Sequence, residues 1–121
     1  MSRVTEPISD EDLVARYRAG ASEHGKSTES GDYKAGNKAA DRVAAAYRTL
    51  RERGLSSQLK LLPLLRDPET GVRGWAGAHA LEFAPDQGEL VLTQLASQRG
   101  LIAFSAKMTL QEWRAGRLRF P

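Results

Sequence analysis

Polar residues gather where two predicted helices should meet. His24 and Thr28 lie one helical turn apart, Asp32 follows a glycine break, and Asn37 and Lys38 come early in the next helix. This set could do acid–base chemistry, with His24 as the general base and Asp32 or Asn37 orienting its ring. The alternative, which we favour, is that these groups hydrogen-bond helix ends and one another and so fix the join. No nucleophile, oxyanion donor set or second carboxylate accompanies the histidine, as catalysis would require.

Cations along the second predicted helix offer a different chemistry. Lys34, Lys38, Arg42 and Arg48 share one side of that helix, and rows of this kind can bind nucleic-acid phosphates. Asp41 interrupts the row, as is usual for solvated helix faces. We therefore expect a solvent-exposed face and keep phosphate-backbone binding as the alternative.

The other histidine and the two tryptophans fit a hydrophobic core. His79 stands alone on an apolar stripe, which predicts a core histidine with one hydrogen-bond partner. Trp75 and Trp113 are expected in the core rather than on a platform that stacks bases.

Composition excludes several kinds of site. The 121 residues include no cysteine, so disulfides, thiolate metal sites and a cysteine nucleophile are excluded. Only two histidines are present, which argues against a His-rich metal site, and we expect no cofactor. No apolar stretch has the length of a signal peptide or a membrane span. We therefore expect a cytoplasmic protein without membrane association.

The net charge of +3 is distributed in blocks. Residues 33–66 carry eight basic and two acidic side chains, residues 67–98 carry one and five, and residues 99–121 carry five and one. Alternating blocks indicate elements that complement one another electrostatically, whereas a nucleic-acid footprint is more often basic throughout.

The elements that must position these residues are all helices. Alanine and leucine dominate, and no window alternates apolar and polar side chains as a strand would. Ser9 followed by Asp12 predicts the start of a first helix, and Gly31-Asp32 predicts the join to a second helix that ends at Gly54. Four shorter helices are expected at about residues 56–66, 70–83, 85–98 and 100–116.

Two of these short helices have a distinctive composition. In the helix at 70–83, Gly71, Gly74 and Gly77 predict close packing against neighbours rather than a phosphate cradle. The last helix is apolar on two sides, which predicts that neighbours cover it on both. One side holds Leu101, Phe104 and Met108, and the other holds Ile102, Ala106, Thr109 and Trp113.

We predict a single all-α domain, an α-α superhelix of about six helices. Residues 1–8 are expected to be a disordered or extended tail, 9–54 a long helical hairpin, 55–116 stacked helices, and 117–121 a second tail.

The stacked region resembles a HEAT repeat. Such repeats have a leucine-rich helix, an acidic turn with proline, and a helix that opens with Val-Arg before spaced alanines. The matching residues here are Leu62, Leu65, Asp67, Pro68, Val72, Arg73, Ala76, Ala80 and Leu81. The resemblance implies HEAT- or armadillo-like stacking over residues 55–116, with Arg73 paired to the turn acid Asp67.

The whole chain is also similar to a family of small, stand-alone bacterial helical proteins with no assigned function. The similarity lies in His24-Gly25, Gly31-Asp32, Asn37-Lys38, Val72 to Ala76, Glu112-Trp113 and Gly116. It implies a fold and no activity.

These patterns predict a non-enzymatic helical module that binds another protein, and an immunity-type partner of a toxin is one form of it. The alternatives are nucleic-acid binding through the basic face of the second helix and an enzyme that uses His24. We assign no catalytic or metal-binding residue. The residues expected at a binding site are His24, Asp32, Asn37, Lys38, Arg42, Arg73 and Trp75.

Overall fold

Helices make up the fold that a computed structural model describes for residues 7–121. Within that range there are six α-helices, one 3-10 helix and no strand, which confirms the predicted all-α class. The predicted tail at residues 1–8 falls mostly outside the described residues. The elements in chain order are α1 (Asp10–Ser30), α2 (Tyr33–Arg53), α3 (Leu55–Gln58), η1 (Leu59–Arg66), α4 (Thr70–Phe83), α5 (Pro85–Ala96) and α6 (Leu101–Arg114).

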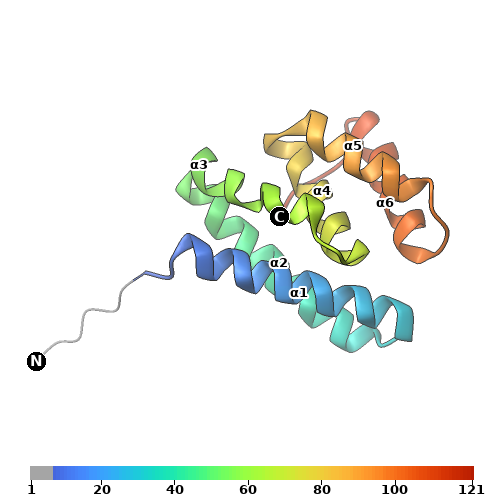
Figure 1. Cartoon of the computed structure of the whole chain (residues 1–121), viewed down its shortest axis with the longest axis horizontal. Helices are drawn as coiled ribbons and strands as arrows, with labels where there is room; N and C mark the ends of the chain where they lie inside the picture. Colours follow the sequence, from blue (N-terminus) through green and yellow to red (C-terminus); the bar gives the residue numbers. More distant parts are fainter. Residues whose placement is uncertain (1–6) are drawn as a thin grey trace, which may run out of the picture.

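The two longest helices, α1 and α2, form a hairpin and lie side by side (Figure 1). The Ser9 side chain accepts a hydrogen bond from the Asp12 amide at 3.0 Å and so caps α1, as predicted. Gly31, with a φ of +77°, ends α1, and Asp32 caps α2 by accepting from the Ala35 amide at 3.1 Å. The join therefore has the predicted local chemistry.

The shorter helices pack against one another above this hairpin (Figure 1). Helix α4 has the predicted bounds, and Pro85 opens α5, which ends at Ala96, two residues before the predicted Gln98. Pro63 lies inside η1, where the chain takes the tighter 3-10 form. Among residues 7–121 no helix combines the length and apolarity needed to cross a bilayer.

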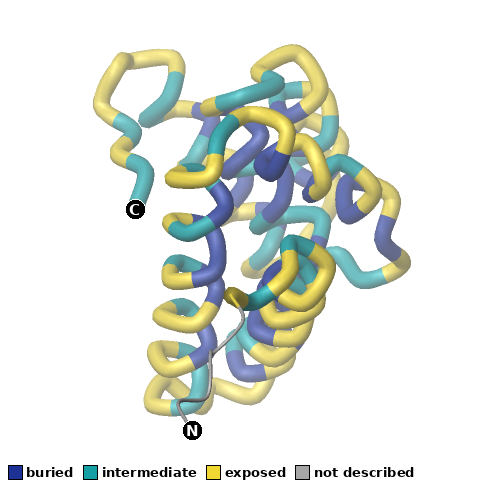
Figure 2. Tube along the Cα trace, turned by 90° about the vertical axis from the view of Figure 1, so that its left-hand side faces the viewer, coloured by how far each residue is buried: buried dark blue, intermediate teal, exposed yellow. Residues whose placement is uncertain are grey.

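Buried residues line the inward faces of the helices, and exposed residues line the outer faces (Figure 2). A larger apolar cluster joins α1, α2, η1 and α4, with Tyr17, Tyr47 and Leu50 among its fully buried side chains. A smaller cluster joins α4, α5 and α6 around Leu92 and Leu95. Helix α4 contributes to both clusters and is therefore the central element of the fold.

A histidine lies at the centre of the larger cluster. His79 is 3% exposed, and a hydrogen bond of 2.6 Å joins its Nδ1 to the Tyr17 hydroxyl, as the prediction of a core histidine requires. Tyr47 stacks on the imidazole with ring centroids 3.9 Å apart. The Tyr47 hydroxyl in turn donates to Glu82 and accepts from Gln58 at 3.0 Å. Burial lowers the pKa of His79 to about 3, so the ring is neutral.

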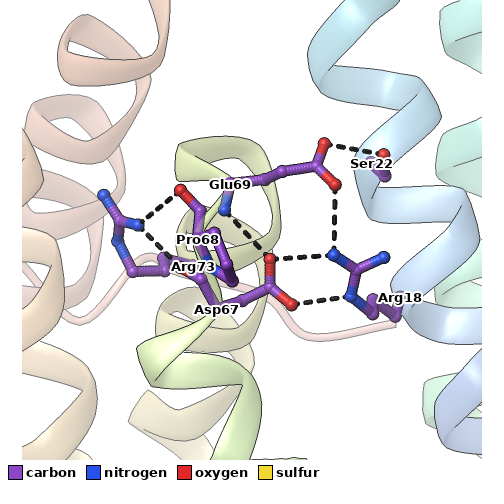
Figure 3. A network of polar contacts seen from close by, with 6 residues as sticks. All are labelled: Arg18, Ser22, Asp67, Pro68, Glu69 and Arg73. Atoms are coloured by element: carbon purple, nitrogen blue, oxygen red, sulfur yellow. Dashed lines mark hydrogen bonds and ion pairs between the residues drawn. The ribbon is translucent and has the colours of Figure 1, made fainter.

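An ionic contact joins α1 to the turn before α4 (Figure 3). Arg18 donates to both carboxylate oxygens of Asp67, at 2.6 and 3.2 Å, and to Glu69 at 3.1 Å. Ser22, one turn along α1, donates to the second oxygen of Glu69 at 2.7 Å. Burial by itself raises the pKa of Asp67, but hydrogen bonds from Arg18 and the Glu69 amide hold it below its usual value.

The pairing of Arg73 with the Asp67 carboxylate, which the HEAT resemblance implied, is wrong. Arg73 instead donates to the main-chain carbonyl oxygens of Asp67 and Pro68, at 2.6 and 3.1 Å. The carboxylate is occupied by Arg18, which stands 49 positions earlier in the chain. Arg73 therefore closes the turn, whereas Arg18 attaches the turn to α1.

The backbones of α1 and α4 touch one turn beyond this ionic contact. A Cβ atom built on Gly71 would lie 3.1 Å from the Gly25 Cα, so even a methyl group would need the two backbones to move apart by a few tenths of an ångström. A Cβ atom built on Gly77 would likewise lie 3.2 Å from the side chain of Leu92. Gly74 differs, because its Cβ would meet only Leu95 and Ile102 at ordinary distances of 3.8 and 3.9 Å. The prediction of close packing is therefore right for Gly71 and Gly77 and wrong for Gly74.

The buried His79 should make folding sensitive to acid. Its pKa is about 3 in the folded protein, against 6.5 for an exposed ring, so in mild acid the unfolded chain binds a proton that the folded chain does not. The free energy of unfolding should therefore fall below about pH 6.5, by about 3 kcal/mol at about pH 4. Chemical denaturation across this range measures it.

His79→Gln keeps a hydrogen-bond acceptor for Tyr17 but cannot titrate, so this variant should lose most of that pH dependence. His24→Gln, which changes the other histidine, should retain most of it. A wild-type unfolding free energy that stays constant from pH 6.5 to about 4 would show that His79 is not held neutral.

The glycine contact between α1 and α4 gives a matched pair of variants. Gly71→Ala places a methyl group against the backbone of Gly25 and should destabilise the protein by about 1–3 kcal/mol. Gly74→Ala has room for its methyl group and should be neutral or stabilising by up to about 1 kcal/mol. Thermal unfolding of both variants beside the wild type tests the difference, and equal effects would contradict it.

Candidate binding site

A pocket of about 220 Å³ opens between α1, α4 and α6. It lies just beyond the Gly25–Gly71 contact, and both glycines belong to its lining. Gly74 and Trp75 of α4 form further parts of its wall. Helix α6 closes the remaining side with Leu101, Ile102, Ser105, Ala106 and Thr109.

His24 and Trp75 stand together in this lining. Their rings meet edge to face, with centroids 5.1 Å apart and planes at 85°. The Thr28 hydroxyl donates to the main-chain carbonyl of His24 at 2.9 Å, and no described residue hydrogen-bonds the imidazole itself. Partial burial lowers the pKa of His24, so the ring is neutral at pH 7 and offers one donor and one acceptor.

Two hydroxyl groups face the same space from α6. Ser105 and Thr109 line the pocket, and neither side chain hydrogen-bonds to any residue in the described range. Mostly apolar walls with a few polar groups are typical of sites that bind and orient a small group. Within residues 7–121 no cluster of three potential metal ligands occurs, and no carboxylate is hydrogen-bonded to His24.

Beside the pocket, α6 exposes a row of large apolar side chains. Leu101, Phe104 and Met108 are 62%, 61% and 40% exposed. The expectation that neighbours cover both apolar sides of this helix is therefore wrong. Its inner side packs on α4 and α5, whereas the row faces solvent. Leu101 belongs to both the row and the pocket, so the two features form one surface.

A larger groove of about 820 Å³ runs along the hairpin between α1 and α2. Three arginines line it, but Arg42 pairs with Glu23 and Arg53 pairs with Asp10 at 2.8 Å. Two of the three arginines in this groove are therefore already paired with carboxylates of the same fold.

The polar set predicted at the hairpin join is not brought together. Asp32 is occupied as the cap of α2, whereas Asn37 and Lys38 are exposed. No hydrogen bond joins their side chains to His24 in the described part of the chain. His24 instead belongs with Trp75, and these two predicted residues share the pocket.

The basic row on α2 is only partly available. Arg42 is paired with Glu23 of α1, whereas Lys34, Lys38 and Arg48 are exposed and have no ion pair among residues 7–121. Arg73 lies on α4 next to Gly74, with its guanidinium turned to the carbonyls of the preceding turn.

Sequence reasoning missed the α6 side of the site. The helix that holds Leu101, Ser105 and Thr109 carried a usable signal, because two apolar faces are more than a helix packed on one side needs. Gly74 also lines the site, but in the sequence it looks the same as Gly71 and Gly77. Only the structure shows that it lacks their close neighbours.

Comparison with known proteins identifies the fold and no family. No protein-family model matches the chain, and no curated protein is significantly similar in sequence. The fold is similar to the crystal structure of the protein RPA1889 from Rhodopseudomonas palustris CGA009, with a TM-score of 0.86 and 23% sequence identity. The match covers 94% of this chain and 95% of that chain. The two chains therefore share one fold over most of their lengths.

Proposed function

We propose that this protein is a binding module that docks another protein on α6. The observation that carries the proposal is the exposed row of Leu101, Phe104 and Met108 beside the pocket. Contiguous apolar side chains on the surface of a monomeric protein commonly mark an interaction site. Burying such a row against a partner would be favourable by about 25 cal/mol for each Å² removed from water.

HEAT-like stacking of residues 55–116, which we propose, would explain why this apolar row is exposed. In stacked helical repeats each helix is covered by the next, and the end helix needs either a polar outer face or a further protein to cover it. Helix α6 is the last helix of the described residues and has an apolar outer face. We propose that the partner takes the place of the next repeat.

A toxin-neutralising role is a narrower form of the same proposal, and it rests on analogy of fold. If it holds, a protein made from a neighbouring gene should arrest growth when expressed alone. Coexpression of this chain should restore growth, and the variant Phe104→Ser should not.

Site-specific photo-crosslinking in the native cells tests the binding role. A photoreactive phenylalanine derivative at position 104 should give a discrete adduct with one other protein. The same derivative at Leu90, which is 60% exposed on α5 but outside the row, should not. Leu101→Ser should weaken the adduct at position 104 by about fivefold or more, because central apolar contacts dominate binding energy.

Equal labelling at both positions would mean that the row is not a specific site. An adduct between two copies of this chain would mean that the row joins copies, and the proposal of a different partner would then fail.

Nucleic-acid binding is a second candidate, favoured by one observation at the end of the hairpin. Tyr33 is 83% exposed at the start of α2, and Lys34, Asn37 and Lys38 are exposed beside it. An exposed aromatic ring among cations can stack on a base while the cations contact phosphates.

Fluorescence anisotropy with a labelled single-stranded oligonucleotide at low salt tests this candidate. The double variant Lys34→Glu, Lys38→Glu should weaken binding by about tenfold or more and reduce its salt dependence. The double variant Arg99→Glu, Lys107→Glu makes the same change of charge at exposed positions on and just before α6 and should have less effect. Equal effects of these variants would show that only net charge matters.

A further inference from the structure

We propose that the pocket between α1, α4 and α6 receives one tyrosine side chain from an acidic segment of the partner protein. The inference rests on the proposed function, and it adds which side chain of the partner is recognised and where. The row of Leu101, Phe104 and Met108 would hold the segment, and the pocket would select it.

The size of the pocket decides against a large ligand. Pockets for drug-sized molecules and cofactors typically span about 300–1,000 Å³, and this one holds about 220 Å³. A protein cavity of about 150 Å³ is known to accept benzene, so the larger volume here suits one aromatic ring with a small substituent. A tyrosine side chain has these dimensions.

The walls fit a ring that ends in a hydroxyl group. Trp75 supplies an aromatic wall, against which a second ring can pack edge to face or offset. His24 supplies a neutral imidazole without a partner in the described residues, next to the Thr109 and Ser105 hydroxyls. A phenol can donate to the imidazole and accept from a hydroxyl, whereas a phenylalanine ring would leave these groups unpaired.

Gly74 lines the pocket without being needed there for close packing. It lies inside α4, where glycine is among the least favourable residues, and it has no positive φ. Unlike Gly71 and Gly77, it has no close neighbour that a methyl group would displace. Its Cβ would point toward Leu95 and Ile102, and Ile102 lines the pocket. Close packing therefore does not require a glycine at this position of the pocket wall.

The charges around the apolar row favour an acidic partner. Arg114 and Arg117 are paired with Glu89 and Glu112, so their charges are compensated within the fold. Arg99 before α6 and Lys107, one residue from Met108, are exposed and have no ion pair among residues 7–121. Two uncompensated cations beside an apolar row would attract acidic residues that flank the inserted tyrosine.

The test uses p-cresol, the side-chain analogue of tyrosine, as the probe. In titrations followed by NMR, p-cresol should shift the Trp75 indole and Gly74 amide signals saturably, with millimolar affinity, and leave Trp113 unchanged. Toluene, which lacks the hydroxyl, should bind about fivefold more weakly, and His24→Leu should remove this difference.

Two variants fill the site from different sides. Gly74→Leu adds a side chain to the α4 wall and Ser105→Leu adds one to the α6 wall, so each should weaken p-cresol binding by about tenfold or more. Ser105 is exposed, which keeps the test valid if Gly74→Leu fails to fold. Thr93→Leu adds the same side chain on the exposed face of α5 and should change nothing.

The outcomes separate this inference from the proposed function. Linear shifts without saturation, or binding unaffected by both variants, would overturn the tyrosine pocket, whereas the crosslink at position 104 would still support a docked protein. Loss of the position-104 crosslink in Ser105→Leu would support the pocket as the point of selection. A small molecule that co-purifies in the pocket, seen by native mass spectrometry, would overturn the choice of a side chain.

Discussion

The backbone contact between Gly25 and Gly71 sets how closely α1 can approach α4, and the surrounding features depend on that approach. On one side of the contact, the helices are near enough for Arg18 and Ser22 to reach the acidic turn before α4 (Figure 3). On the other side, the pocket opens between α1, α4 and α6. A single pair of glycines thus borders both the ionic contact and the binding surface.

The buried polar side chains among the described residues are already hydrogen-bonded within the fold. Within residues 7–121 no buried side-chain nitrogen or oxygen lacks a hydrogen-bond partner. Tyr17, Tyr47 and His79 form the most elaborate buried group; each has a hydrogen-bond partner that fixes its position, and burial keeps each of them neutral. The His24 imidazole is different, because it is only half-buried, lines the pocket and has no hydrogen-bond partner among the described residues. Among the described residues, the polar groups that remain free to meet a ligand therefore lie at the surface and not in the core.

Local signals in the sequence were enough for the elements but not for their partners. Ser9, Gly31 and Pro85 act on the backbone beside them, so the sequence could predict the start of α1, the join to α2 and the start of α5 closely. Arg18 meets Asp67 across 49 positions, and no local pattern distinguishes it from Arg73, which the repeat resemblance favoured. For the candidate site, the sequence supplied His24 and Trp75 but joined His24 to the wrong neighbours. Which of the two apolar faces of α6 is covered depends on how all the helices pack together. Helical periodicity alone does not predict which face is buried.

The three glycines of α4 show how packing and binding can be separated in such a fold. All three carry the same penalty in a helix, and in sequence they look alike. Gly71 and Gly77 are explained by the backbone and side chain that approach them. At Gly74 the helix would be more stable with alanine, whose methyl group would meet Leu95 and Ile102 at ordinary distances, and this glycine lines the pocket. A position where the fold gains nothing from its residue is where selection for a ligand is most easily recognised, because stability and function there favour different side chains.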